Sequence, residues 1–394
     1  MIVPLGEAVA DTCGGKAGAL GTLLRAGLPV PDGFVLPYAA YRAAVRDLDR
    51  RAVETRPVHA AVIDAVGRAL RELGDPPVAV RSSAAGEDTG QASAAGQYES
   101  FLAVRGTAGV AHAVRACWAS LFSPRAIDYR DASGRPAGDP AMAVIVQRHL
   151  DAEVSGVMFT PADADDPTLI EASWGLGPSV VGGQVAPDAY RVAGDGSVTR
   201  TVGDKRTRLD RHGARLVVSE VPIRAREQQA IDDATAERLA GLGRRIAAVL
   251  GGPQDIEWAI ADGRLWVLQA RPVTATPPPP RVAPAATAAV LSGIPGSHGT
   301  VTGAARIVRG PGDFARVRAG DILVCPFTDP AWTPLLRVVA GVVTETGGVL
   351  SHAAIVAREQ AIPAVLGVPD AMSRLRDDTV LTIDGTAGTV TAAG

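Results

Sequence analysis

Cysteine is scarce in this chain of 394 residues. Its three cysteines, Cys13, Cys117 and Cys325, are odd in number and lie far apart in the sequence. Small secreted domains that depend on disulfides have many paired cysteines, and cysteine metal sites need closely spaced thiols. The spacing argues against a disulfide framework and against a cysteine metal cluster. A chain of this length can instead bury a sizeable core and is expected to fold as two or three domains.

Aromatic residues are also few, at 4% of the sequence, and the formal net charge is −3 with no run of basic residues. Domains that bind nucleic acid are typically basic, so this composition gives such binding no electrostatic support. No segment has the apolar length that spans a bilayer, and Met1–Ala10 lacks the basic start and apolar run of a signal peptide. These absences predict a cytoplasmic protein that binds neither nucleic acid nor membranes.

Lysine is almost absent. Of the 39 basic residues only Lys16 and Lys205 are lysines, which leaves 39 − 2 = 37 arginines. Lysine carries a compact charge that contacts a phosphate as a point, so both are candidate phosphate ligands, with ordinary surface residues as the alternative. Lys16 follows a Gly-Gly pair at the start of a predicted helix, a setting that suits anion binding. Lys205 follows a predicted hairpin around residues 194–196.

The segment Thr344–Glu359, with the sequence TETGGVLSHAAIVARE, is the most informative part of the chain. Its two adjacent glycines let the backbone approach a ligand closely, and His352 stands at the start of an apolar helix predicted over 353–359. The free N–H groups of that helix and the positive end of its dipole would face the histidine. They would favour a neutral, nucleophilic imidazole and stabilise an attached phosphoryl group. A helix cap or a buried core histidine is the alternative interpretation.

A second informative segment, residues 254–272, predicts a β-hairpin that turns at an Asp-Gly pair. Alternation places Asp255 and Glu257 on one face of the first strand, and Gln269 and Arg271 on one face of the second. A three-residue loop with a glycine bulge sets Glu257 opposite Gln269, whereas a two-residue loop does not, so we expect an odd-numbered loop. The four side chains then form one patch, with oxygens for Mg²⁺ and a guanidinium for phosphates. The alternative is an exposed polar strand face.

Other segments between the two lysines have features that suit an anion site. Residues 78–83 predict a short buried strand that carries Arg81, and residues 142–147 predict another strand. Residues 91–98 are a run of small residues. Their backbone amides would line a phosphate tail, or they would form a flexible surface loop.

The pattern Thr-x-x-Gly-Gly-x-x-Ser-His-x-Ala-x-x-x-Arg at 344–358, continued by Ile-Pro-Ala-Val-Leu-Gly at 362–367, resembles the phosphohistidine domain of the phosphoenolpyruvate-utilising enzymes. That family includes phosphoenolpyruvate synthase, pyruvate phosphate dikinase and rifampicin phosphotransferase. The segments around Lys16, Arg81, 94–97, 174–177 and 269–272 resemble the nucleotide-binding domain of the same family. The implied fold is α/β, in the α+β sense, with an ATP-grasp-type nucleotide-binding domain followed by a small swivelling phosphohistidine domain.

The resemblance implies a role for each matching residue. The residues that would contact ATP are Lys16, Arg81, Ser93, Gly96, Gln97, Gln147, Lys205, Asp255 and Arg271. Glu257 and Gln269 would hold Mg²⁺. His352 would carry the phosphoryl group, with Thr344, Ser351, Gly347 and Gly348 around it. A helix-capping role for Ser351 is an equal alternative.

A proline run at 277–280 marks a domain boundary. We expect an ATP-grasp-type domain over 1–276, a proline-rich linker over 277–289 and a phosphohistidine domain over 290–394. The linker is expected to be semi-rigid in the polyproline II form. It is either a simple spacer or an arm on which the histidine moves between two places.

The resemblance implies that the β-phosphoryl group of ATP passes to His352 and then to an acceptor, with release of AMP. No counterpart of the pyruvate-binding barrel, or of the acceptor-binding domain of rifampicin phosphotransferase, is recognisable in these 394 residues. The expected acceptor is therefore an unidentified small molecule, held either in the cleft between the domains or by a partner subunit. Two other functions stay open. One is a phosphocarrier that feeds a partner protein, and the other is an ATP-grasp ligase that forms an acyl phosphate and ADP.

Overall fold

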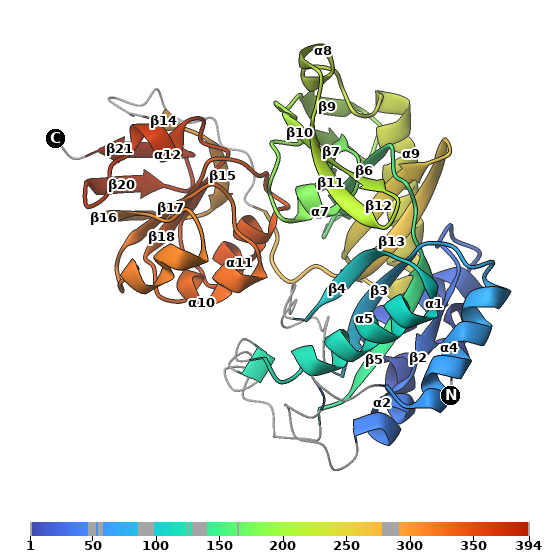
Figure 1. Ribbon diagram of the computed structural model, residues 1–394. Helices are drawn as coiled ribbons and strands as arrows, with labels where there is room; N and C mark the ends of the chain where they lie inside the picture. Colours follow the sequence, from blue (N-terminus) through green and yellow to red (C-terminus); the bar gives the residue numbers. More distant parts are fainter. Residues whose placement is uncertain are drawn as a thin grey trace. The chain divides into compact units, whose positions relative to one another are not determined.

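The computed structural model describes residues 2–45, 53, 58–85, 98–123, 126–127, 140–163, 165–277 and 291–392. It is a mixed α/β structure, as predicted (Figure 1). The chain divides into two compact units, each assembled from separate segments. The first unit contains Met1–Glu153, Leu209–Ser219 and Arg238–Val273, and the second contains Val154–Arg208, Glu220–Glu237 and Thr274–Gly394. The predicted linker at 277–289 lies, apart from Pro277, outside the described residues.

The first unit contains a five-stranded antiparallel sheet with the strand order β1-β2-β5-β3-β4. Its strands are β1 (Val3–Pro4), β2 (Gly33–Leu36), β3 (Val78–Ala84), β4 (Ser100–Val104) and β5 (Met142–Arg148). The helical segments of this unit are η1 (Leu5–Glu7), α1 (Ala10–Arg25), α2 (Tyr38–Val45), α4 (Ala60–Glu72) and α5 (Gly106–Ser120). Helices α1 and α5 both pack against β3 and β5. The strands predicted at 78–83 and 142–147 are confirmed as β3 and β5.

Helix α1 changes direction at Gly14, whose φ of 85° is outside the helical range. A Cβ atom at this position would lie 2.3 Å from the hydroxyl oxygen of Ser83 on β3. The N–H group of Ala17 donates to that same oxygen at 3.2 Å. Glycine is therefore required for the close approach of α1 to β3, and the kink places Lys16 in the turn that faces this strand.

The predicted hairpin is formed by β12 (Gln254–Ala261) and β13 (Arg264–Pro272). Its loop has two residues, and both have positive φ, at 51° and 66°, as in a type I′ turn. The prediction of an odd-numbered loop is therefore wrong. The predicted pairing of Glu257 with Gln269 is nevertheless confirmed, because a bulge at Leu268 adds the extra residue inside the strand.

In the second unit four antiparallel strands follow one another in the order β6-β7-β8-β9. They are β6 (Val154–Phe159), β7 (Thr168–Trp174), β8 (Asp188–Val192) and β9 (Val198–Thr201), with the short helices α7 (Pro178–Val181) and α8 (Ile223–Arg226). The turn between β8 and β9 confirms the hairpin predicted around 194–196. Three elements have residues assigned to both units: β10 (Thr207–His212), β11 (Arg215–Glu220) and α9 (Asp233–Leu250).

The C-terminal part of the second unit contains an eight-stranded sheet with the order β14-β21-β20-β16-β17-β18-β19-β15. Its central strands β16 to β19 are parallel, and its outer strands pair antiparallel. The strands are β14 (Leu291–Ser292), β15 (Ile294–Ser297), β16 (Thr300–Ile307), β17 (Ile322–Cys325), β18 (Gly341–Thr344), β19 (Ala364–Leu366), β20 (Val380–Asp384) and β21 (Thr389–Ala392). The helical segments are η2 (Pro311–Arg316), η3 (Pro330–Trp332), α10 (Thr333–Leu336), α11 (His352–Glu359) and α12 (Ala371–Arg374).

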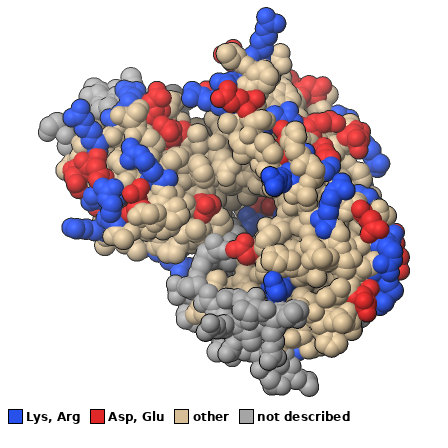
Figure 2. All heavy atoms as spheres, in the orientation of Figure 1, with Lys and Arg blue, Asp and Glu red and all other residues tan. Residues whose placement is uncertain are grey.

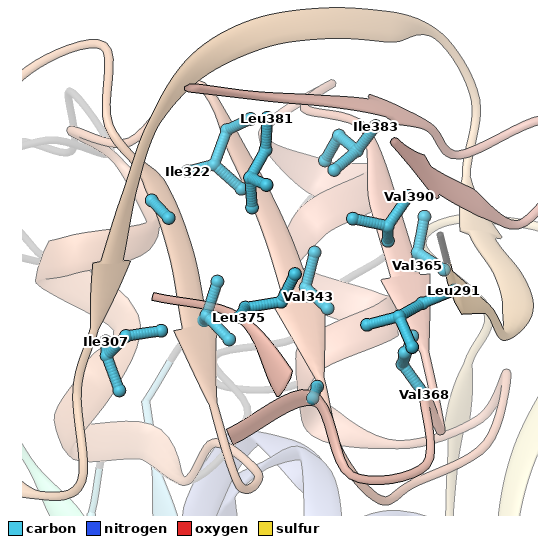
Figure 3. Packing of buried hydrophobic residues seen from close by; sticks show 13 residues of the cluster. Leu291, Ile307, Ile322, Val343, Val365, Val368, Leu375, Leu381, Ile383 and Val390 are labelled. Carbon is cyan, nitrogen blue, oxygen red and sulfur yellow. The ribbon is translucent and has the colours of Figure 1, made fainter. Parts of the chain in front are cut away.

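Alternation along the central strands divides this core into two hydrophobic clusters. Ile322 and Val324 of β17 belong to the cluster that β20 and β21 also line (Figure 3). Leu323 and Cys325 belong to the second cluster, which the apolar residues of α10 and α11 complete. Burial of its apolar residues against β17, β18 and β19 thus holds α11, and with it His352, on the sheet.

The distribution of charged side chains on the surface agrees with the low net charge of the chain. Acidic and basic side chains are interspersed over the face shown in Figure 2. Within the described part of the chain, no helix has the length and apolar character needed to cross a membrane. All three cysteines are buried, and none forms a disulfide.

Candidate active site

His352 lies at the carboxyl end of the parallel strands of the C-terminal sheet. Strands β17 and β18 are parallel neighbours, Thr328 comes three residues after β17, and His352 begins the helix that follows β18. Loops that leave the carboxyl ends of parallel strands converge at one edge, which is where α/β folds place their ligand sites. The fold therefore brings side chains from two connections together at His352.

The imidazole of His352 is buried between two threonine hydroxyls, with 4% of the residue exposed. Its Nδ1 lies 2.8 Å from Oγ1 of Thr328, and its Nε2 lies 3.4 Å from Oγ1 of Thr333. A neutral imidazole has one N–H group and one lone pair. A threonine hydroxyl can donate or accept, so the contact with Thr328 is compatible with both tautomers. In the tautomer whose Nδ1–H group donates to Thr328, the lone pair lies on Nε2.

The sequence analysis missed these two threonines. They are 24 and 19 residues away from His352 in the chain. The available signal was two threonines, Thr328 and Thr333, in the connection that follows the buried strand β17. Using that signal requires knowledge of the strand order, which the sequence pattern does not contain.

Thr344 and Ser351 make hydrogen bonds with the backbone of the histidine loop. The hydroxyl of Thr344 donates to the carbonyl of Thr346 at 2.7 Å, and that of Ser351 donates to the carbonyl of Gly348 at 2.8 Å. Ser351 occupies the N-cap position of α11, but its side chain accepts no capping hydrogen bond. In this structure both hydroxyls shape the loop, whereas Thr328 and Thr333 orient the ring.

The two glycines of the loop are needed for different reasons. Gly347 has a φ of 98°, a conformation that L-residues with a side chain rarely adopt. A Cβ atom at Gly348 would lie 2.1 Å from Oε1 of Glu171. The close approach that the sequence analysis predicted at this pair is therefore made, at Gly348, to a carboxyl group of the chain itself.

In the first unit, polar groups of the β12–β13 hairpin converge on Arg81. Its Nη2 donates to Oε2 of Glu257 and to Oε1 of Gln269, each at 2.8 Å. Its Nη1 donates to the carbonyl of Leu268 at 2.9 Å. The bulge at Leu268 thus has two effects: it sets Glu257 opposite Gln269, and it supplies a carbonyl to the same guanidinium.

Electrostatics keep the Glu257 carboxylate ionised. Burial by itself would raise the pKa of Glu257, but the charge and hydrogen bond of Arg81 outweigh it, with further help from Arg271 and Lys16. The net result is a pKa below the ordinary value of a glutamate. The charge of Lys16 thus lowers the pKa of the same carboxyl group as Arg81 does.

Asp255 and Arg271 form a second pair on the hairpin. They lie directly opposite one another, and Nε of Arg271 donates to Oδ2 of Asp255 at 2.8 Å. Both side chains are buried. The predicted patch of four polar residues thus consists of an Asp255–Arg271 ion pair next to a Glu257–Gln269 pair that binds Arg81.

The oxygens of Glu257 and Gln269 fit a magnesium ion. Magnesium prefers oxygen ligands, takes few of them from the protein and keeps water or phosphate oxygens in its other positions. Both side chains already direct an oxygen at one positively charged nitrogen, Nη2 of Arg81. Among the described residues no group of three or more His, Cys, Asp or Glu side chains could hold a metal. A magnesium ion here would therefore depend on nucleotide phosphates to complete its shell.

Two residues expected at the nucleotide are buried in internal hydrogen bonds. The Nζ atom of Lys205 donates to Asp188 and to the carbonyls of Gly203 and Arg226, which uses all three of its donors. The side-chain amide of Gln147 donates to the carbonyl of Pro31 at 3.1 Å. Ser93, Gly96 and Gln97, expected in the loop over the phosphates, lie outside the described residues.

Comparison with known proteins identifies the family of this chain. The model of the pyruvate phosphate dikinase AMP/ATP-binding domain matches residues 48–288, which is more than half of the chain. The model of the mobile domain of PEP-utilising enzymes matches residues 317–388. The chain belongs to this family of ATP-binding, phosphoenolpyruvate-utilising phosphotransferases, as the resemblance predicted. The family is of the dikinase type, with a phosphohistidine intermediate, and uses ATP and Mg²⁺. The predicted ATP-binding domain is likewise confirmed.

Similar curated proteins are phosphoenolpyruvate synthases. A probable phosphoenolpyruvate synthase of Methanothermobacter thermautotrophicus is 37% identical over 98% of this chain and 62% of its own length. One of Archaeoglobus fulgidus is 36% identical over 96% of this chain and 56% of its own length. The phosphoenolpyruvate synthase of Pyrococcus furiosus is 31% identical with the same two coverages, 96% and 56%. The chain thus spans little more than half the length of these relatives.

Proposed function

We propose that this chain is an ATP-dependent, AMP-forming phosphotransferase that moves the β-phosphoryl group of ATP through His352 to a small-molecule acceptor. The observation that carries the proposal is the setting of the His352 ring. Its Nδ1 is 2.8 Å from the Thr328 hydroxyl. In the proposed reactive tautomer Nδ1–H donates to that hydroxyl, and the lone pair of the neutral ring lies on Nε2. A nucleophilic ring nitrogen in a domain of the phosphoenolpyruvate-utilising type is what a phosphohistidine mechanism needs.

In the proposed first step, Nε2 of His352 forms a bond to the β-phosphorus of ATP. The bond from that phosphorus to the oxygen shared with the α-phosphate breaks, and AMP leaves with that oxygen. The positive charge that develops on the ring is stabilised by the Thr328 hydroxyl oxygen, which accepts the Nδ1–H group. Transfer of the γ-phosphoryl group to water or to inorganic phosphate then leaves a single phosphoryl group on Nε2. The acceptor takes this group and restores the neutral ring.

Side chains of the first unit are assigned to the nucleotide. Lys16, Arg81 and Arg271 would offset the negative charge of the triphosphate, and Glu257 and Gln269 would hold Mg²⁺. The ion, when bound, offsets charge on the phosphate oxygens. We assign Lys205 a structural role in place of the expected ATP contact, because its three donors are used inside the protein.

The name of the curated relatives, phosphoenolpyruvate synthase, makes pyruvate the first acceptor to test. If pyruvate takes no phosphoryl group from the labelled protein, a screen of other small molecules follows. A partner protein that carries the acceptor site is then tested by adding cell extract to the phosphorylated chain.

Incubation with Mg²⁺ and ATP labelled at the β-phosphate tests the donor half of the proposal. The wild type is expected to take up acid-labile, base-stable label and to produce AMP, and His352→Ala is expected to take up none. His298→Ala is a matched control, because His298 is an exposed histidine in the same part of the chain. Label recovered only as ADP, together with full activity of His352→Ala, would instead support an ATP-grasp ligase.

A further inference from the structure

Glu171 on strand β7 is a buried acidic residue that the proposed transfer does not use. Only 2% of the residue is exposed. Its Oε1 accepts the N–H group of Leu350 at 3.3 Å, and the N–H group of Val349 also faces the carboxyl group. Leu350 is two residues before His352, so the two Cα atoms are at most about 7 Å apart. An acidic side chain of β7 therefore contacts the loop that carries the histidine.

Further contacts join the histidine loop to residues 183–185, which follow helix α7. The hydroxyl of Thr346 donates to the carbonyl of Gly183 at 2.6 Å, and the N–H group of Gly347 donates to the carbonyl of Val185 at 3.2 Å. A Cβ atom added at Gly183 would lie 3.2 Å from the Cβ atom of Ser351. The loop 346–351 and the segment 183–185 thus meet where their side chains are small or missing.

We propose that Glu171 is a positioning residue, whose carboxyl group fixes the loop 346–351 against β7 so that His352 is held for reaction with ATP. This inference rests on the proposed function, because it assumes that His352 accepts a phosphoryl group. A loop with two adjacent glycines loses much conformational entropy when it becomes ordered. Hydrogen bonds from its amides to a buried acceptor offset that loss, and the missing side chain at Gly348 gives the acceptor room.

The surroundings of Glu171 determine the protonation state in which its carboxyl group holds the loop. Burial raises the pKa of Glu171 to about 7, against the opposing effects of the Leu350 and Val349 amides and of Arg358. The carboxyl group is therefore readily neutral, and a neutral carboxyl still accepts an N–H group through its carbonyl oxygen. Glutamine has the same acceptor at the same length, whereas alanine has none. If Glu171 is a positioning residue, Glu171→Gln keeps the loop in place and Glu171→Ala does not.

Three variants test this inference: Glu171→Gln, Glu171→Ala and, as a control, Glu237→Gln at an exposed glutamate of α9. Amide hydrogen exchange of residues 346–351 is measured without ATP, and single-turnover labelling of His352 is measured with β-labelled ATP. In Glu171→Ala we expect exchange to be faster and labelling to be slower, each by about tenfold or more, with ATP affinity unchanged. Glu171→Gln and Glu237→Gln are expected to behave as the wild type.

A further variant, Gly348→Ala, separates loss of the loop contact from a general folding defect. Gly348→Ala keeps Glu171 but places a Cβ atom on its carboxyl oxygen, so it is expected to loosen the same loop residues as Glu171→Ala. Unchanged exchange of residues 346–351 in Glu171→Ala would overturn the inference. So would a Glu171→Gln variant as slow as Glu171→Ala, because the charge or proton would then be what matters. If the wild type takes up no label, the proposed function fails, and the exchange data still decide whether Glu171 fixes the loop.

Discussion

Nδ1 of His352 lies 2.8 Å from the hydroxyl oxygen of Thr328, although the two residues belong to different connections of the C-terminal sheet. Strand β17 ends shortly before Thr328, and β18 ends shortly before the histidine loop. Their parallel pairing is what brings the ring and the hydroxyl together. This contact orients the imidazole ring.

Thr328→Val is expected to slow phosphorylation of His352 by about 10- to 100-fold, because the ring loses the hydrogen bond that orients it. Thr333→Val is expected to have a smaller effect, since its contact with Nε2 is longer, at 3.4 Å. The measurement is the initial rate at which acid-labile label appears. Thr302→Val, at an exposed threonine pair on β16, is the control. Equal rates in Thr328→Val and wild type would contradict the assignment of Nε2 as the nucleophile.

Arg81→Lys is expected to weaken ATP binding by about tenfold, although it keeps the positive charge. Lysine cannot reproduce the planar guanidinium, which contacts Glu257, Gln269 and the Leu268 carbonyl together. Calorimetric titration with ATP, with and without Mg²⁺, measures the loss. Arg264→Lys serves as the control, because Arg264 is exposed on the same hairpin and stacks on Trp266. An unchanged affinity in Arg81→Lys would remove Arg81 from the nucleotide site.

The stability of the second unit is expected to depend on pH through Glu171. Its pKa is raised by burial from 4.5 to about 7 in the folded protein. The folded state therefore holds the proton more tightly than the unfolded chain, and the associated stability is fully present below about pH 4.5. It is lost as the pH rises to about 7 and is constant above that value. The full difference is roughly 3 kcal/mol. Urea unfolding of wild type and Glu171→Gln from pH 4.5 to 8 measures it, and parallel curves for the two proteins would contradict it.

Lys205→Met is expected to destabilise the protein by about 3–5 kcal/mol, because it leaves the buried Asp188 carboxylate without its cation. Arg206→Met removes the exposed neighbouring pair with Asp204 and is expected to cost about 0–1 kcal/mol. Urea unfolding measures both changes. ATP affinity of folded Lys205→Met is expected to match the wild type. A large loss of affinity with little loss of stability would restore the ATP contact predicted from the sequence.

The hairpin of β12 and β13 illustrates how far sequence reasoning reached. Side chains alternate between the two faces of a strand, and this alternation allowed Glu257 and Gln269 to lie on the same face of the hairpin. We predicted that they pair because both are expected to hold the same Mg²⁺ ion. The pairing is confirmed, but the loop length is wrong, because a bulge at Leu268 adds the extra residue within the strand. The alternation of side chains along a strand predicts which face a residue lies on, but it does not predict where a bulge occurs.

The two lysines illustrate the opposite case. Their rarity in an arginine-rich chain made both candidates for phosphate binding. Lys16 acts on the Glu257 carboxylate, whereas Lys205 is fully buried in an ion pair with Asp188. Composition carries no information about burial, so it could not separate a lysine at a ligand site from one inside the protein.

The sequence by itself determined the local features of this protein: the glycine pair before His352, the helix that begins at the histidine, and the strand that carries Arg81. These follow from backbone preferences and periodicity within a few residues. Only the tertiary structure decided which distant groups meet them. The contacts of Thr328 with His352, of Glu171 with Leu350 and of Asp188 with Lys205 join residues that are 17 to 179 positions apart in the sequence. Such contacts depend on strand order and close packing of the folded chain, and neither is encoded in any single segment.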